Sequence, residues 1–150
     1  MPRSLHPIAG CAALVIIALF WSSTVVSELF GTMAQVVTVK TTIPWGFIIL
    51  IPALAATGIT GMRRAGRRKG GLIARKQRRM PFIAANGLLV LIPSALFLAA
   101  KAEARDFDTL FYAVQVLELL AGAVNISLLG LSMRDGLRLT RGRRLPAAAG

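Results

Sequence analysis

A row of polar residues in the C-terminal third of the sequence has the spacing of one helix face. Gln115, Glu118 and Asn125 are separated by three and seven residues, and Gly122 lies between the last two, so all four share a face. Large aliphatic side chains occupy neighbouring positions of the same stretch: Leu119, Leu120, Val124 and Leu128. The pattern predicts a helix with a polar seam toward other helices and an apolar side toward lipid.

Glu118 is the residue of this seam that could carry chemistry. It is the only charged residue between Thr109 and Met133. A carboxylate at the centre of a bilayer costs at least about 2.5–3.5 kcal/mol unless it is protonated, paired or hydrated. A carboxyl group with amide neighbours could bind a proton, a cation or a polar substrate. The same side chains could instead only hold helices together, at about 0.6 kcal/mol per hydrogen bond, and both interpretations stay open.

A second apolar stretch, residues 81–100, offers partners for the seam. If it forms an antiparallel hairpin with residues 109–133, residues at equal depth have numbers that sum to about 210. Asn86 then lies level with Asn125, and Ser94 lies level with Glu118. Pro93 cannot donate to the carbonyl of the residue four positions earlier, which leaves that carbonyl free to accept a bond. With no lysine or arginine expected at this depth, we predict a protonated, neutral Glu118.

The composition places these residues in a membrane protein. The chain has 150 residues with 18 Lys+Arg against 6 Asp+Glu, yet 55% of it is hydrophobic and its mean hydropathy is positive. A disordered basic segment would be far less apolar, and a disulfide scaffold needs more than the single Cys11. No nucleotide-binding loop, metal cluster or nucleophile–base pair is visible, so we expect neither an enzyme nor a bound cofactor.

Four stretches are long and apolar enough to cross a bilayer, and together they predict one all-α transmembrane domain over residues 1–150. We expect a four-helix bundle with spans at about 8–30, 43–62, 81–100 and 109–133. The first stretch is interpreted as a retained span, because its apolar run is long for a cleaved signal peptide. Cys11 lies inside that run and is interpreted as a small packing residue rather than a lipidation site.

The basic residues are distributed unevenly between the two sides of the predicted bundle. Residues 63–79, expected as a loop, contain nine basic residues and no acidic one: Arg63, Arg64, Arg67, Arg68, Lys69, Arg75, Lys76, Arg78 and Arg79. The expected tail, 134–150, adds five arginines against Asp135, whereas the other two connections hold only Lys40, Lys101 and Arg105. The positive-inside rule therefore predicts that both termini are cytoplasmic, in a bacterial-type inner membrane.

The basic segment is also a candidate binding surface. It would attract the anionic lipids of the inner leaflet at roughly 1 kcal/mol per residue near the surface, and an acidic protein partner or an RNA are alternatives. No aromatic residue interleaves with the charges, so bases would have nothing to stack upon and nucleic-acid binding is disfavoured. Rows of small residues such as Ala53, Thr57 and Gly61 would allow close helix contacts, including contacts within a homo-oligomer.

Two functional classes follow from these features. The first is a non-catalytic accessory protein or subunit of a membrane complex. The alternative is a small proton-coupled transporter or permeation unit that uses Glu118, with Asn86, Gln115 and Asn125 along its route. A minor alternative is haem binding, because His6 and a methionine near the same membrane face could supply axial ligands. His6 is the only histidine, which excludes a bis-histidine haem.

Overall fold

The computed structural model describes the backbone of residues 5–65 and 71–141, and the side chains of residues 8–59 and 79–137. The described backbone is all-helical apart from two short connections, with no strand. The elements in chain order are α1 (Leu5–Phe30), α2 (Met33–Ala65), α3 (Gly71–Asn86), the π-helical η1 (Gly87–Leu91), α4 (Ile92–Glu103) and α5 (Thr109–Arg141).

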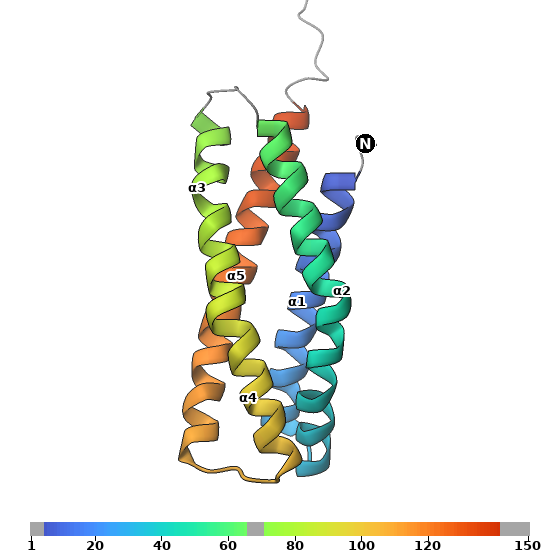
Figure 1. Cartoon of the computed structure of the whole chain (residues 1–150), viewed down its shortest axis with the longest axis vertical. Coiled ribbons are helices and arrows are strands. Elements are labelled where there is room, and N and C mark those ends of the chain that lie inside the picture. Colours follow the sequence, from blue (N-terminus) through green and yellow to red (C-terminus); the bar gives the residue numbers. More distant parts are fainter. Residues whose placement is uncertain (1–4, 66–70, 142–150) are drawn as a thin grey trace, which may run out of the picture.

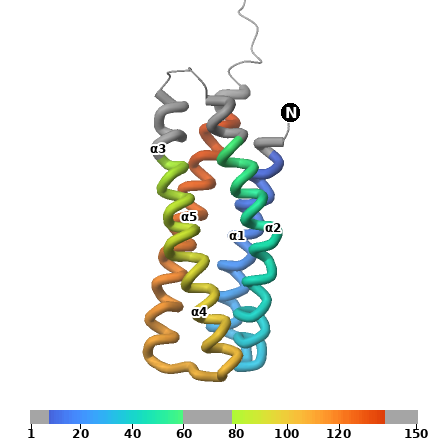
Figure 2. The backbone as a smooth tube through the Cα atoms, viewed as in Figure 1, coloured from blue at the N-terminus to red at the C-terminus, as the bar shows by residue number. Residues whose placement is uncertain are grey.

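The helices form four upright rods, because α3, η1 and α4 continue one another (Figure 1). The α1–α2 and α4–α5 connections lie at one end of the bundle, which we call the turn end; α1 begins and α5 ends toward the other, the termini end (Figure 2). Four helical segments are long and apolar enough to cross a membrane: Ile8–Phe30, Met33–Ile59, Arg79–Glu103 and Thr109–Leu137. They confirm the four expected spans, whereas the direction in which the bundle crosses the membrane stays a prediction.

The second span begins at Met33 rather than near residue 43, which corrects the expected boundary. Gly31 closes α1 by donating its N–H to the carbonyl of Ser27 at 2.9 Å. Thr32 and Gln35 then form a reciprocal cap: the Thr32 N–H donates to Gln35 Oε1 at 2.7 Å, and the Gln35 N–H donates to Thr32 Oγ1 at 3.4 Å. This capping box starts α2 directly after α1, so Lys40 belongs to a helix and not to a connection.

The helices also continue beyond the expected spans at the termini end. The backbone is helical to Ala65, again from Gly71, and to Arg141, so the expected loop 63–79 and tail 134–150 are partly helical. Arginine and lysine are good helix formers, and a continued helix keeps its backbone hydrogen bonds satisfied. Arg67, Arg68 and Lys69 lie outside the described residues, as do the side chains of His6, Arg63, Arg64, Arg75, Lys76 and Arg78.

A π-helical turn carries the third rod past Pro93. The Ile92 N–H donates to the carbonyl of Gly87, five residues earlier, where an α-helix would use the carbonyl four residues earlier. Pro93 has no N–H, so the α-helical ladder is already interrupted at this point, and a single π turn is a common way to accommodate such a break. The rod therefore stays helical through the predicted proline site.

Two apolar clusters lie at different depths of the bundle. The turn-end cluster is within about 8 Å of the turn end, counted at 1.5 Å per residue; it comprises Val36, Leu98, Ala102 and Phe111. The central cluster lies about 20–30 Å from the turn end and comprises Ala13, Ile17, Leu50, Ile83 and Leu129. Between these two clusters lie the buried side chains of Lys40 and Glu118.

Candidate functional site: a buried ion pair within the helical bundle

Lys40 of α2 and Glu118 of α5 form an ion pair inside the bundle. Lys40 Nζ lies 2.7 Å from Glu118 Oε2, and the two side chains are only 1% and 12% exposed. This contact overturns the expectation that no basic side chain reaches the depth of Glu118. A carboxylate paired with an ammonium group need not be neutral to be buried, so the argument for a permanently protonated Glu118 fails.

The two partners meet because each helix starts at a defined residue of the turn end. Lys40 follows the start of α2 at Met33 by seven residues, and Glu118 follows the start of α5 at Thr109 by nine. At 1.5 Å per residue they lie roughly 10 and 13 Å from the turn end. The start of α5 is fixed by Asp108, whose Oδ1 accepts the Phe111 N–H at 2.8 Å.

Glu28 of α1 adds a second acid to the pair. It lies within electrostatic range of Lys40 and Glu118, but it forms no ion pair with Lys40 among the described contacts and, two residues before the end of α1, lies about 3 Å from the turn end. Its Oε1 is buried and has no hydrogen-bond partner among the described residues. Three helices thus place two carboxyl groups and one ammonium group in one region of the bundle, and Glu28 Oε1 is left without a partner among the described residues.

Gln115 lies one turn before Glu118 on α5 and is 4% exposed. Both its amide nitrogen and its amide oxygen are buried without a hydrogen-bond partner in the described part of the chain. A buried polar group without a hydrogen-bond partner lowers the free energy of unfolding by about 1–3 kcal/mol. The Gln115 amide therefore destabilises the fold if its only role is packing. We call Glu28, Lys40, Gln115 and Glu118 the charged level.

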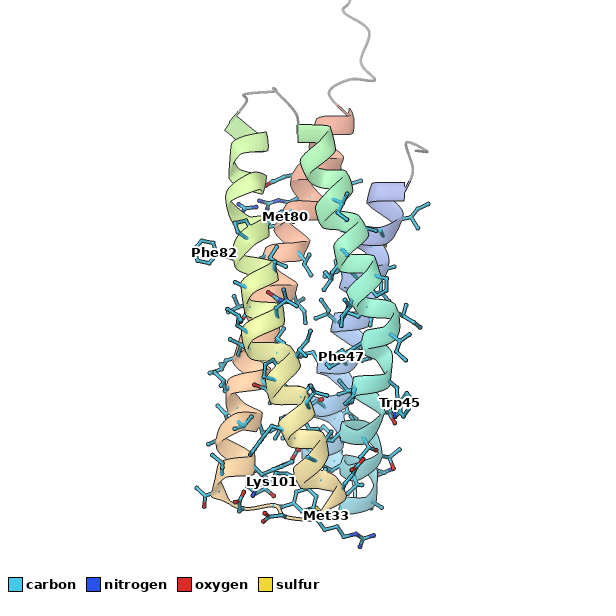
Figure 3. The ribbon with its side chains drawn as sticks, in the orientation of Figure 1. Met33, Trp45, Phe47, Met80, Phe82 and Lys101 are labelled. Carbon is cyan, nitrogen blue, oxygen red and sulfur yellow. The ribbon has the colours of Figure 1, made fainter. Side chains whose placement is uncertain are left out.

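A cavity of about 60 Å³ borders the charged level, which is room for about two water molecules. Glu118 and Thr24 contribute to its wall, and most of the remaining wall is apolar. Trp21 closes one side: its Nε1 donates to the Leu119 carbonyl at 2.9 Å, and its ring packs against Gly122. In Figure 3, Phe47 is directed into the bundle toward this region, whereas Trp45 points away from it.

The predicted amide pair forms a second polar level, nearer the termini end. Asn86 Nδ2 donates to the Ala121 carbonyl at 2.8 Å and to Asn125 Oδ1 at 3.1 Å. Asn125 Nδ2 in turn donates to the Ile83 carbonyl at 3.5 Å, and Asn125 is 1% exposed. The predicted register of the hairpin is therefore confirmed, and we call this pair the amide level.

The other seam residue, Ser94, is buried on α4 at 7% exposure. The sequence places Ser94 level with Glu118, but no hydrogen bond joins the two among the described contacts, in which Glu118 Oε2 is bound by Lys40. The seam that the sequence predicts as one unit is divided into a charged level and an amide level.

Another ion pair lies near the termini end. Arg79 Nη1 of α3 lies 2.9 Å from Asp135 Oδ2 of α5, and the Asp135 side chain is 5% exposed. Asp135 was expected in a solvated tail, but α5 continues through it and buries it. Arg79, expected on a lipid-binding surface, ties two helices together, and its part in lipid binding stays a prediction; the remaining basic residues of that surface lie outside the described side chains.

Sequence reasoning missed Lys40 and Glu28 as members of the site. The capping box at Thr32 and Gln35 is the sequence signal that could have placed Lys40 inside a helix. Among the described side chains, no group of three or more His, Cys, Asp or Glu could hold a metal ion. Comparison of the chain with protein-family models, curated proteins and solved structures gives no match, so its own residues must carry the functional argument.

Proposed function

We propose that the chain is a small multi-pass protein of a bacterial-type cytoplasmic membrane, with both termini inside, that moves protons by way of Glu118. The observation that carries this proposal is the buried Lys40–Glu118 pair beside the unpartnered Gln115 amide and Glu28 oxygen. A polar contact that serves only structure is expected to have its hydrogen-bonding groups paired, as at the amide level. Ionisable residues in a span with spare hydrogen-bonding capacity favour a functional site.

The charges of the site favour uptake of one proton. With Glu28, Lys40 and Glu118 all ionised, two negative charges face one positive charge and the cluster carries −1. Adding a proton makes it neutral, and a neutral cluster is easier to hold in a medium of low dielectric constant. Proton binding at Glu118 removes the partner of Lys40, whose ammonium group then turns to the free oxygen of Glu28. Loss of the proton restores the Lys40–Glu118 pair.

The size of the site supports a proton as the cargo. A cavity of about 60 Å³ is far below the roughly 300–1,000 Å³ of sites that bind small organic molecules. The turn-end cluster and the central cluster lie on either side of the Lys40–Glu118 pair, and we take this arrangement to be a closed state of the proposed transporter. Transport then needs a small opening of one cluster at a time, with Gln115 hydrogen-bonded to the water that enters.

Proton flux into reconstituted vesicles tests the proposal. Liposomes that contain the purified protein and a pH-sensitive dye receive an inside-negative potential from potassium and valinomycin. The wild type is expected to acidify the lumen faster than protein-free liposomes, and Glu118→Gln to abolish the difference. Glu103→Gln, the same change at an exposed acid of the turn end, is the matched control and retains flux. Wild-type flux equal to that of empty liposomes, or full flux in Glu118→Gln, would contradict the proposal.

The second candidate is a non-catalytic accessory protein or subunit of a membrane complex. This candidate is supported by the low burial of the first two helices. Within the chain, 17% of the most apolar segment of α1 and of α2 is buried, against 28% and 33% in the other two spans. A pull-down in mild detergent separates the two candidates. A stoichiometric partner, together with a function that survives Glu118→Gln but not removal of the basic charges of residues 63–79, would favour the accessory role.

A further inference from the structure

A pocket of about 300 Å³ opens at the turn end, between the start of α2 and the α4–α5 connection. Its wall is formed by Met33, Ala34, Val37, Arg105 and Phe107, of which only Arg105 is charged. The volume is at the lower end of the range for small-molecule sites. It is separate from the cavity at the charged level, which none of these five residues lines.

Arg105 occupies a backbone position that normally belongs to glycine. Helix α4 ends in a Schellman motif: the Asp106 N–H donates to the Lys101 carbonyl at 2.9 Å, and the Arg105 N–H donates to the Ala102 carbonyl at 3.1 Å. The residue after the cap of such a motif is left-handed, and Arg105 has a φ of 54°. Glycine adopts this conformation without strain whereas arginine does not. We therefore expect the Arg105 side chain to have a role that offsets the backbone strain.

The neighbouring acids do not neutralise Arg105. Lys101 Nζ lies 2.5 Å from Asp106 Oδ2 and 2.8 Å from Asp108 Oδ2, so it is bound to both. No acidic side chain among the described residues lies within ion-pair distance of Arg105. The connection thus presents an exposed arginine, without an ion-pair partner among the described residues, that contributes to the wall of a mostly apolar pocket.

We propose that this pocket binds the headgroup phosphate of an anionic phospholipid, with Arg105 as the phosphate ligand. A guanidinium group matches two phosphate oxygens with two parallel N–H bonds. Met33, Val37 and Phe107 give the glycerol backbone and the upper acyl chain an apolar wall. The pocket lies at the end of the membrane-spanning helices, where lipid headgroups are found, so the bilayer itself supplies the ligand. This proposal is independent of proton movement through Glu118.

Native mass spectrometry of the detergent-purified chain, titrated with phosphatidylglycerol, tests this site. Arg105→Gln removes the charge and keeps the strained backbone, and it is expected to weaken lipid binding about tenfold, the loss of one charge-assisted contact. Arg105→Gly also removes the charge but relieves the strain, so it should lose binding while its thermal stability is unchanged or raised. Arg134→Gln, at an exposed arginine of the opposite end, is the matched control and binds as the wild type does.

Two further ligands define the source of the phosphate. Glycerophosphoglycerol has the same phosphodiester headgroup without acyl chains, and it is expected to bind far more weakly than phosphatidylglycerol; zwitterionic phosphatidylcholine should also bind more weakly. Unchanged lipid binding in Arg105→Gln would overturn the proposal. Equal losses in Arg105→Gln and Arg134→Gln, or glycerophosphoglycerol binding as tightly as the intact lipid, would overturn it as well.

Discussion

The charged level and the amide level lie on the same face of α5, seven residues apart, and differ in how completely they are satisfied. At the amide level, Asn86 and Asn125 use their side-chain groups on each other and on the carbonyls of Ala121 and Ile83. At the charged level, a buried ion pair is accompanied by an amide and a carboxyl oxygen that have no partner in the described structure.

The difference separates two uses of polarity inside a membrane. A satisfied neutral pair holds two helices in register and gains nothing from a change of protonation. A buried ion pair with unpartnered polar groups beside it can change partners, and under our proposal a proton switches it. The following experiments test whether the levels differ in this way, beginning with the largest expected effect.

Breaking the buried ion pair should have the largest effect on stability. Lys40→Met leaves Glu118 buried without its partner and is expected to lower the free energy of unfolding by about 3–5 kcal/mol. The double variant Lys40→Met/Glu118→Leu should recover most of this loss, because it removes both charges. The free energies of unfolding of the wild type, the single variant and the double variant are measured in mixed micelles with increasing amounts of denaturing detergent. Lys101→Met, at the exposed turn end, serves as control and should cost much less; additive losses in the double variant would show that the pair is not coupled.

Gly122 of α5 packs closely against Trp21 of α1 at a depth between the two levels, and this contact should not tolerate an added side chain. A Cβ at Gly122 would lie 2.8 Å from Trp21 Cδ1, so Gly122→Ala must displace the indole and weaken its bond to the Leu119 carbonyl. We expect a loss of about 1–3 kcal/mol. Gly130→Ala lies on the same helix with nothing within 4 Å of the new Cβ, and should be neutral or stabilising by up to about 1 kcal/mol. Equal effects at the two glycines in the same unfolding assay would argue against the packing of Trp21 on α5.

The amide level should matter for stability and not for proton flux. Asn86→Leu is expected to cost about 0.6–1.7 kcal/mol. The double variant with Asn125→Leu should cost less than the sum of the two single changes, since both remove the Asn86–Asn125 bond and only the Asn125–Ile83 bond is lost in addition. Proton flux in vesicles should stay at the wild-type rate for both variants that fold. A loss of flux comparable to that of Glu118→Gln would place the amide level on the proton route and erase the distinction between the levels.

The smallest expected effect is a pH dependence at the turn end. The hydrogen bond from Lys101, followed by that from the Phe111 N–H, holds the pKa of Asp108 below its ordinary value of 3.8. A lowered pKa in the folded state means that the contribution is full above the ordinary value and is lost as the pH falls through the lower one. Hydrogen exchange should therefore show loosening of the Phe111 amide only in acid, below pH 3.8. Asp108→Asn, which keeps a capping oxygen, should abolish this dependence; loosening at higher pH would contradict the assignment.

The sequence predicted the four helices and the amide level because both follow from local patterns. Apolar runs define the spans, and the antiparallel register of one hairpin places Asn86 beside Asn125. It did not predict the partner of Glu118, since the second apolar stretch was ended at the charge of Lys40 and the capping box at Thr32 was overlooked. The approach of α2 to α5 is a contact between two hairpins, which no local pattern specifies. The Arg79–Asp135 pair was missed for a related reason, because the helices continue beyond their apolar segments.

Infrared difference spectroscopy of the reconstituted protein tests the central claim that Glu118 exchanges a proton. A protonated carboxyl group has a carbonyl-stretch band that a carboxylate lacks, and its change with pH can be followed in the intact protein. We predict that acidification produces such a band, that it disappears in Glu118→Gln, and that it persists in Glu103→Gln. Lys40→Gln should shift the pH at which the band appears, because Lys40 is the counter-charge of the carboxylate. A band pattern in Glu118→Gln identical to that of the wild type would contradict the account.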